Sequence, residues 1–462
     1  MSRVPEGPPL TIAQAGRLIA AGKLSPLELT RALLARIEAL NPELNAFVTV
    51  TERQALAAAR AVGRSSRRGA LAGIPVGYKD IFNTAGIRTT AHSKLLADNI
   101  PDEDAEAVRR LSTAGAVMLG KLATHEFAIG GPAFDLPWPP ARNPWDARRY
   151  TGGSSSGAGA AVAAGLVLGA LGSDTGGSIR LPAAYCGIAG LKPTPGLVSR
   201  RGVIPLAPSL DTVGPMAWTA QDCAILLDAL AGYDPADPAS VAGPRVAYAR
   251  SIVAPVKGLK VGLLRRFHEH DVPGSPEVLQ MISRAVAVLK GLGCRVDEAV
   301  LPPVQEFNAV GRVIISAEAF ALHEPALRTR LADYSRVFRV RVLGGALIRA
   351  ADYIAAQRQR TDLIATVAKQ FERFDVLVTV PTAGAAPLLT EQRPDEGFAR
   401  PFLTTVANVA AVPSLVVCGG FTAAGLPLGI EIMGPAWGDA TVLRVGHHFE
   451  RAAGTRDRRP GM

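Results

Sequence analysis

Apolar residues at the start of the chain recur at helical spacing. Two amphipathic helices are expected in the first 41 residues, one beginning after Thr11 and one after Ser25, which is followed by a proline at the first helical position. The apolar face of the second helix consists of Leu29, Leu33, Ile37 and Leu40.

From residue 46 onward, short apolar runs alternate with helical patterns. Buried strands are expected at 73–78, 116–119, 260–264, 295–299, 376–380, 415–418 and 428–433. Helices are expected at 104–114, 158–168, 317–330 and 345–371. This alternation predicts an α/β fold in which helices cover both faces of a sheet, and the three late strands are expected to rejoin that one central sheet.

The same pattern predicts a single domain over residues 1–455. Its expected parts are a helical N-terminal part at 1–72, a core with the candidate chemistry at 73–235, a more variable, substrate-side part at 245–400 and a return to the sheet at 401–455. A stretch rich in Pro and Ala at 231–257 is the best candidate for a join between parts. Residues 456–462 are expected to form a flexible tail.

Composition then narrows the class of protein. The chain has 462 residues, of which 48% are hydrophobic, so it can bury a large core. A formal charge of +10 would suit a nucleic-acid partner, because clustered Lys and Arg attract phosphates. The basic residues are scattered in short groups such as 64–68 and 456–459, so no nucleic-acid binding is expected.

Cysteine usage and hydropathy exclude further classes. The four cysteines form no CxxC pair and no Cys/His cluster, so neither a metal nor another cofactor is expected, and a reducing compartment fits best. Residues 1–5 carry no apolar signal region, and Pro and Gly break the longest uncharged run, 401–430. A cytoplasmic location without a membrane partner is therefore expected.

Two short loops rich in glycine and serine carry the candidate chemistry. Thr-Gly-Gly-Ser-Ser-Ser-Gly occupies 151–157, and Gly-Ser-Asp-Thr-Gly-Gly-Ser occupies 172–178. Glycine lets successive backbone N–H groups turn toward one point and lets a substrate approach closely. An oxyanion hole for acyl transfer needs this arrangement, and the second loop could supply it from the amides of Thr175, Gly176, Gly177 and Ser178.

A serine nucleophile needs a base, and none of the seven histidines has a catalytic setting in the sequence. Lys79 ends the apolar strand predicted at 73–78, where burial can make its neutral amine accessible near pH 7. Asp80 follows it and is expected to point to the other side of the strand.

Three other patterns look like known motifs and are rejected. Residues 153–157 fit GxSxG, but no later histidine has the setting that this nucleophile elbow needs. Residues 115–122 nearly fit a P-loop, but Leu122 replaces the Ser or Thr that binds magnesium. The adjacent His447 and His448 point apart on a helix, so they are expected to be surface histidines.

Taken together, Gly-Ile-Pro-Val-Gly-Tyr-Lys-Asp at 73–80, Gly-Gly-Ser-Ser-Ser-Gly at 152–157 and Asp-Thr-Gly-Gly-Ser-Ile-Arg at 174–180 resemble the amidase signature family. The spacing of 24 residues between Ser154 and Ser178 also resembles that family, and the likeness extends over nearly the whole chain. The resemblance implies a central mixed, twisted sheet covered by helices on both faces.

The resemblance also implies a role for each site residue. Ser178 would be the nucleophile, and Ser154, held by a cis peptide bond and with Ser155 as the fallback, would relay its proton to Lys79. Residues around this triad would hold it in register: Ser155, Ser173, Asp174 and Arg180.

Two activities of the family are weighed for this chain. The favoured one is a stand-alone amidohydrolase that cleaves a small-molecule carboxamide, without nucleic acid or membrane and with a homodimer considered. The alternative is the glutaminase (A) subunit of a tRNA-dependent amidotransferase, in which Arg360 would hold the glutamine carboxylate. That subunit has an aspartate for the glutamine amine where this chain has Pro401, within 398–402, and this favours the stand-alone enzyme.

A catalytically silent binding protein on the same scaffold is a remote third interpretation, since all the triad positions are intact. The substrate itself is open. The loop at 131–140 is expected to line the entrance to the site, and its Phe134 and Trp138 would either contact an apolar acyl group or merely pack the loop.

Overall fold

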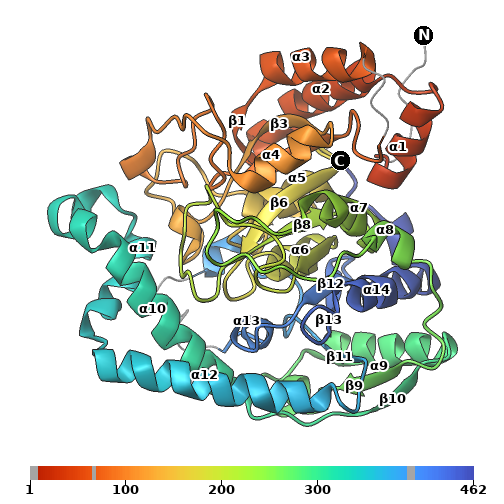
Figure 1. Cartoon of the computed structure of the whole chain (residues 1–462), viewed down its shortest axis with the longest axis vertical. Coiled ribbons are helices and arrows are strands. Elements are labelled where there is room, and N and C mark those ends of the chain that lie inside the picture. The colour runs from red at the N-terminus through yellow and green to blue at the C-terminus, as the bar shows by residue number, and fades with distance from the viewer. Residues whose placement is uncertain (1–8, 65–68, 393–400) are drawn as a thin grey trace.

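A central sheet of eleven strands organises the molecule in the computed structural model, which describes residues 9–64, 69–392 and 401–462 (Figure 1). The strand order is β1-β3-β2-β6-β8-β7-β12-β13-β11-β9-β10. The strands are β1 Phe47–Val50, β2 Pro75–Lys79, β3 Val117–Leu122, β6 Gly169–Asp174, β7 Ala189–Lys192, β8 Thr212–Ala217, β9 Lys260–Leu263, β10 Arg295–Glu298, β11 Val376–Thr379, β12 Ser414–Phe421 and β13 Pro427–Met433. A separate hairpin pairs β4 Arg142–Asn143 with β5 Asp146–Tyr150.

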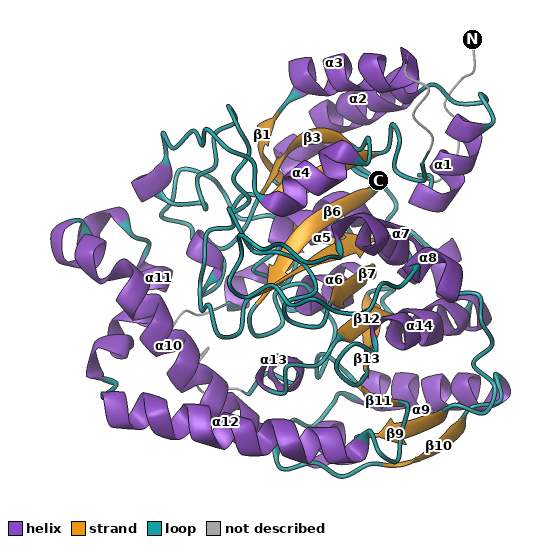
Figure 2. Ribbon diagram, in the orientation of Figure 1, coloured by secondary structure: helices purple, strands orange, loops and turns teal. Residues whose placement is uncertain are grey.

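The sheet is mixed. Its parallel pairs are β2 with β3 and β6, and β9 with β10 and β11; the other neighbours are antiparallel. Helices pack on both faces of the sheet (Figure 2), so the predicted fold class is confirmed. The late strands β11, β12 and β13 join this one sheet, as the apolar runs predicted.

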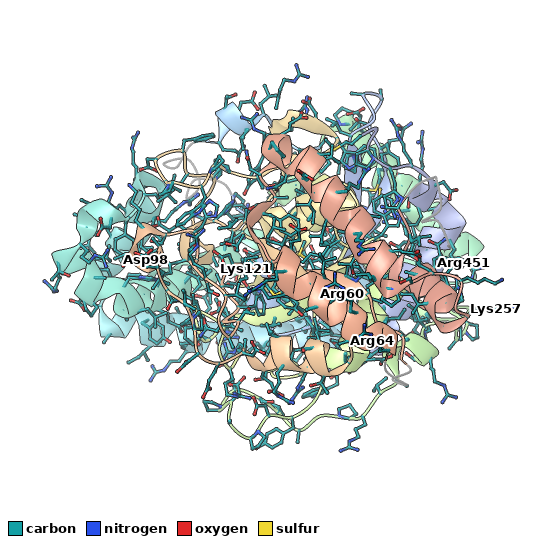
Figure 3. The ribbon with its side chains drawn as sticks, turned by 90° about the horizontal axis from the view of Figure 1, so that it is seen from above. Arg60, Arg64, Asp98, Lys121, Lys257 and Arg451 are labelled. Atoms are coloured by element: carbon teal, nitrogen blue, oxygen red, sulfur yellow. The ribbon has the colours of Figure 1, made fainter. Side chains whose placement is uncertain are left out.

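The helices are α1 Ile12–Ala20, α2 Pro26–Leu44, α3 Glu52–Arg64, α4 Glu106–Thr113, α5 Ser156–Ala163, α6 Arg180–Cys186, α7 Ala220–Leu230, α8 Tyr248–Ser251, α9 Pro276–Gly291, α10 Val304–Thr329, α11 Arg336–Val342, α12 Ala350–Gln370, α13 Thr405–Val409 and α14 Asp439–Ala453. The Thr11 side chain caps α1 by accepting the N–H of Gln14, and Pro26 opens α2. Seen from above, α2 and α3 lie over the N-terminal part of the sheet (Figure 3).

Small residues let two helices reach the centre of the fold. Every residue of α5 is buried, and α5 packs against α6 as well as against the central strands. A side chain at Gly157 would collide with the backbone of residues 46 and 123. The helix predicted at 158–168 is therefore shorter and begins earlier, since the chain turns at Gly165, whose φ is +65°.

The C-terminal residues pack against the fold instead of forming the expected free tail. Arg456 donates to the Trp218 carbonyl, and the Arg458 guanidinium lies 4.7 Å from the Phe421 ring centre. The expectations for residues 1–5, 65–68 and 398–400 fall outside the described residues. The division of one domain into four parts stays a prediction.

None of the helices in the described part of the chain is both long and apolar enough to cross a membrane.

Candidate active site

Lys79 is the last residue of β2, in the middle of the parallel part of the sheet. Its side chain is fully buried, and its Nζ lies 2.7 Å from Ser154 Oγ and 2.8 Å from Ser173 Oγ. Burial lowers the pKa of Lys79 from its ordinary value near 10.5 to about 7, while the more distant Asp211 and Asp174 oppose that shift. A neutral amine is therefore accessible near neutral pH.

Asp80 turns away from this amine, as strand geometry predicted. Its Oδ2 accepts the N–H and the hydroxyl of Thr90, and its Oδ1 lies 3.8 Å from the buried ammonium of Lys121. Lys121 also donates to the carbonyl of Phe82 and to the hydroxyl of Thr89. The Asp80 carboxylate is thus paired with Thr90 and Lys121, whereas the Lys79 amine is hydrogen-bonded to the two serines.

Ser154 lies in the loop just before α5, and the peptide bond between Gly153 and Ser154 is cis. Glycine at 153 allows a close approach, since a Cβ there would lie 2.1 Å from the His125 ring. The neighbouring Ser155 turns elsewhere: its N–H donates to the Ser178 carbonyl and its hydroxyl to the Ser173 carbonyl. Of the two serines considered, Ser154 is therefore the one that contacts Lys79.

Ser178 follows the Gly176-Gly177 turn directly before α6, and it is the partly exposed member of the predicted triad. Ser178 and Ser154 line the same cavity. The Gly177 N–H already donates to Asp174 Oδ1 at 2.8 Å, which leaves the amides of Thr175, Gly176 and Ser178 for an oxyanion. Gly177 has φ +129°, a conformation that glycine adopts without strain.

A buried ionic network fixes this turn to the late strands. Arg180 is fully buried and forms two hydrogen bonds to the Asp174 carboxylate, at 2.8 and 3.0 Å, and one to Glu431 of β13 at 2.6 Å. Asp174 in turn accepts the N–H of Ile179. Desolvation would raise the pKa of Asp174, but the charge of Arg180 and the hydrogen bonds from Arg180, Asn408 and Ile179 outweigh it and hold that pKa well below its ordinary value. The network thus connects the candidate oxyanion loop to strand β13.

Replacing Arg180 by methionine should lower the free energy of unfolding by about 3–5 kcal/mol, because two buried carboxylates would lose their cation. Urea denaturation at neutral pH measures this change. The matched control is Arg328→Met, which removes an exposed ion pair with Glu324 at 2.6 Å and should cost at most about 1 kcal/mol. Equal effects of the two substitutions would show that burial of the Arg180 network does not matter for stability.

The catalytic cavity has a volume of about 160 Å³ and lies between the two serine loops and helix α10. His125, which the sequence did not indicate, forms part of its wall and stacks on Tyr150, with 3.2 Å between Nε2 and the Tyr150 hydroxyl. Burial lowers the pKa of His125 to about 3, so the ring is neutral and does not compete for a proton. The backbone N–H of His125 donates to the Ser154 carbonyl and helps to hold the serine loop in place.

Two arginines also line the catalytic cavity, Arg312 on α10 and Arg341 on α11. Burial lowers the pKa of both, and the charge of Arg312 lowers that of Arg341 further. None of the described residues lining this cavity is Asp or Glu. The described wall of the cavity is therefore basic, and a substrate carboxylate is the kind of group that arginine binds.

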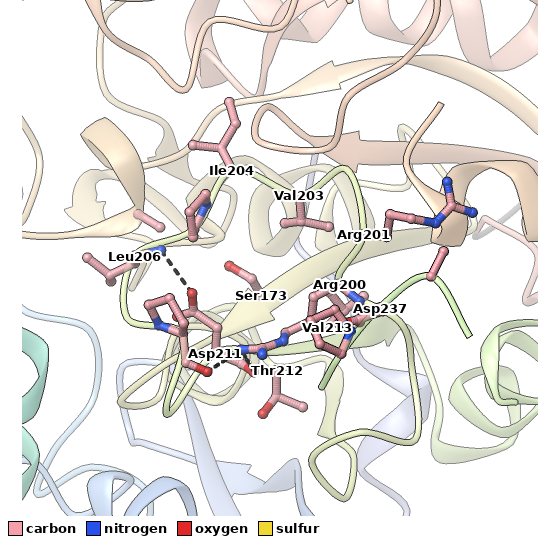
Figure 4. Close-up of a pocket in the computed structure, with 15 residues that line it drawn as sticks. Ser173, Arg200, Arg201, Val203, Ile204, Leu206, Asp211, Thr212, Val213 and Asp237 are labelled. Atoms are coloured by element: carbon pink, nitrogen blue, oxygen red, sulfur yellow. Dashed lines mark hydrogen bonds between the residues drawn. The ribbon is translucent and has the colours of Figure 1, made fainter. Parts of the chain in front are cut away.

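A second cavity, of about 320 Å³, adjoins the first one (Figure 4). Ala128 and Leu206 belong to the walls of both cavities, whereas Ser173 belongs to the second one only. Asp211 lies in its wall and accepts the hydroxyl of Thr175 at 2.6 Å. The Lys79 amine, bonded to Ser154 and Ser173, therefore lies between two cavities.

Two specificity features predicted from the sequence are not in the catalytic cavity. Arg360 lies on α12 and donates to the Val409 carbonyl at 3.2 Å. Trp138 packs on His92, with 5.7 Å between ring centres, and Phe134 is largely exposed, so these rings pack the loop or face solvent. A third cavity, of about 710 Å³, borders the catalytic one at Tyr150, Arg341 and Phe402, and Pro401 lies in its wall.

The part of the chain that the structure describes contains no group of three or more His, Cys, Asp or Glu side chains that could hold a metal ion. The arrangement places the Ser178 and Ser154 hydroxyls, the amides of the second serine loop and a lysine with lowered pKa around the catalytic cavity. These are the groups needed for acyl transfer from an amide.

Comparison with known proteins agrees with this geometry. A model of the Amidase family matches residues 28–443. The chain is 38% identical to the A subunit of glutamyl-tRNA(Gln) amidotransferase from Geobacter metallireducens, over 98% of this chain and 99% of that one. The solved structure of the corresponding protein from Thermotoga maritima is 33% identical, with a TM-score of 0.82 and coverage of 96% and 94%.

A further solved structure, of a vestigial protein complex connected with the origins of an s-triazine catabolic enzyme, superposes with a TM-score of 0.89 at 32% identity. It covers 96% of this chain and 98% of that one.

Proposed function

Because this chain belongs to the amidase family, and is therefore a carbon–nitrogen hydrolase, we propose that it acts as the glutamine-hydrolysing component of a tRNA-dependent amidotransferase. The observation that carries the proposal is the similarity to such subunits along nearly the full length of both chains. The two guanidinium groups in the catalytic cavity support it, since glutamine has a carboxylate besides the amide that is cleaved.

These relatives overturn two expectations drawn from the sequence. The stand-alone amidohydrolase was favoured because Pro401 replaces an aspartate, and the same reasoning predicted a small-molecule substrate alone, without nucleic acid. Both expectations are wrong, since the relatives are subunits of an enzyme named for its tRNA. Pro401 is one residue in the wall of the third cavity, whereas the similarity to these subunits extends over nearly the whole chain.

In the proposed reaction, Ser178 Oγ attacks the carboxamide carbon of glutamine while its proton passes through Ser154 to Lys79. The oxyanion that forms would accept hydrogen bonds from the backbone N–H groups of Thr175, Gly176 and Ser178. Collapse of this intermediate breaks the carbon–nitrogen bond, and the relay returns the proton to the departing ammonia. Water then hydrolyses the acyl-enzyme and restores Ser178, with glutamate as the second product.

Ammonia release from glutamine tests the proposal, measured on the chain alone and on the chain with the remaining amidotransferase subunits and glutamylated tRNA. Hydrolysis of glutamine that increases when those components are added is the expected result. If the chain alone hydrolyses simple amides but neither it nor the mixture hydrolyses glutamine, the proposed function is wrong.

Replacing Arg341 by methionine should raise KM for glutamine by about tenfold or more, because a charge-assisted hydrogen bond to the substrate carboxylate is lost. The readout is glutaminase activity of the assembled enzyme as a function of glutamine concentration. Arg360→Met is the matched control, and it should change KM by less than about threefold, since Arg360 lies outside the cavity. A reversed order of the two effects would restore Arg360 as the carboxylate-binding residue.

A further inference from the structure

Helix α12 is anchored by one face only. The inward face carries Tyr353, Gln357 and Arg360 at helical spacing: the Tyr353 hydroxyl donates to Glu318 at 2.7 Å, Gln357 donates to the Ser209 hydroxyl at 3.3 Å, and Arg360 donates to Val409. Buried Ala356 and Leu363 continue this face. The rotation of the helix is therefore fixed, and so are the residues that point outward.

Exposed apolar residues continue from the short helix before α12 onto the outward face of the first turns of α12. Leu343, Leu347 and Ile354 are 41%, 84% and 51% exposed, and the alanines between them are exposed as well. We call this set the α12 stripe; it runs from the short helix η5, Leu343–Leu347, into α12 and consists of Leu343, Ala346, Leu347, Ala350, Ala351, Ile354 and Ala355. Beyond it, the same face becomes polar at Arg358 and Gln359.

The stripe spans two elements. Leu343, Ala346 and Leu347 belong to the short helix η5, residues 348 and 349 are extended, and the other members lie in the first turns of α12. Within α12, positions 351, 354 and 355 share one face, and contiguous exposed apolar side chains are a feature of interaction sites. Four of the seven members of the stripe are alanines, which let a second helix axis approach closely. Figure 1 shows α12 along an outer edge of the molecule.

The charge around the stripe points to the chemistry of its partner. Residues 321–370 contain nine Lys or Arg against four Asp or Glu, which is half of the net charge of +10. Several of these arginines, such as Arg328, are paired, but Arg336, Arg339 and Arg358 form no ion pair with any described residue. A partner that complements this surface would carry acidic residues.

We propose that the α12 stripe is the docking surface for a helix of another protein of the amidotransferase complex, with an apolar seam against the stripe and acidic residues toward Arg339 and Arg358. This inference rests on the proposed function, since it needs a second subunit. Apolar contact supplies the affinity, and the arginines set the orientation and the rate of encounter.

The test uses the full-length chain and the purified remaining subunits of glutamyl-tRNA(Gln) amidotransferase from the same genome. Leu347→Glu and Ile354→Glu should each weaken complex formation by at least about tenfold, measured as a dissociation constant and by light scattering of the eluted complex. Arg358→Glu should weaken it at low salt and less at high salt. Val253→Glu, at a position that is 67% exposed outside this region, should leave affinity unchanged.

Wild-type affinity in the Leu347→Glu and Ile354→Glu variants would overturn the docking surface and leave the proposed function standing. If the wild-type chain itself did not bind these subunits, both the docking surface and the proposed function would be wrong. Glutaminase activity of the chain without any partner would then define its activity. Two other results would also overturn the inference: dimers of this chain that Leu347→Glu dissociates, or binding to vesicles of anionic lipid that Leu347→Glu abolishes.

Discussion

Ser178→Ala should lower amide turnover by at least about three orders of magnitude, because the acyl-enzyme can no longer form. Ser178 is the partly exposed serine of the triad and stands beside three amides that have no other hydrogen-bond partner among the described residues. The residual turnover of the Ser178→Ala variant would reflect binding and polarisation of the substrate by those amides alone. The measurement is kcat for ammonia release at saturating substrate.

Ser156→Ala is the matched control, since Ser156 belongs to the same loop as Ser154 but donates to the Ala123 carbonyl on the far side of the loop. It should keep turnover within about threefold of wild type. A fluorophosphonate probe should label the wild-type chain and the Ser156→Ala variant, but not Ser178→Ala. Turnover of the Ser178→Ala variant within about tenfold of wild type would remove Ser178 as the nucleophile.

Lys79→Arg should be nearly as inactive as Lys79→Ala, with losses of at least about a hundredfold, because a guanidinium stays protonated and cannot accept the serine proton. The pH dependence follows from the same requirement. Burial lowers the pKa of Lys79 to about 7, so the active neutral form increases as pH rises through that value. The rate should therefore rise with pH, about tenfold per unit below pH 7, and level off above it.

Lys192 provides the control for this pH profile. It is also fully buried, and desolvation lowers its pKa to about 7. Its Nζ donates to the Pro193 carbonyl, however, and Lys192 is not among the described residues that line the catalytic cavity. Lys192→Met should leave the rising limb in place. If that limb moved in Lys192→Met, or if Lys79→Arg kept near-wild-type turnover, a base other than Lys79 would have to be sought.

The positions of the triad were predictable because they depend on motifs that are local in the sequence. Lys79 ends an apolar strand, and the two serine loops stand 24 residues apart, so each group could be named before its neighbours in space were known. The structure then brings Lys79 and Ser154 to 2.7 Å. The catalytic roles of these residues stay predictions, which the substitutions above test.

Four strands of the central sheet, β1, β6, β7 and β8, were not predicted from the sequence. For the last three the reason is their composition. β6 has the sequence Gly-Ala-Leu-Gly-Ser-Asp, and β7 and β8 also contain glycine or proline, so they lack the branched apolar runs by which strands are recognised. Packing in the middle of the sheet overrides this weak propensity. As a result Ser173, expected in a glycine loop, lies on a strand beside Lys79.

The substrate-binding residues could not be found from the sequence, because they come together only through long-range packing. Arg312 and Arg341 reach the cavity from helices more than 130 residues after Ser178. Arg360 has the same chemistry and a similar place in the sequence, but the rotation of α12 directs it to a backbone carbonyl. His125 belongs to the stretch His125-Glu126-Phe127, which is part of the likeness to the family, but that stretch does not distinguish a residue of the cavity wall from a packed histidine.

The strand order has a consequence for how the chain is made. Strands β1 to β3 and β6 to β8 form one side of the sheet and β9 to β11 the other, but β12 and β13, which join them, are synthesised last. Until residue 433 has left the ribosome, β7 and β11 are open edges that can pair with other chains. Folding of the nascent chain is therefore expected to depend on its C-terminal segment, and any product that terminates before residue 414 should aggregate rather than accumulate as a soluble fragment.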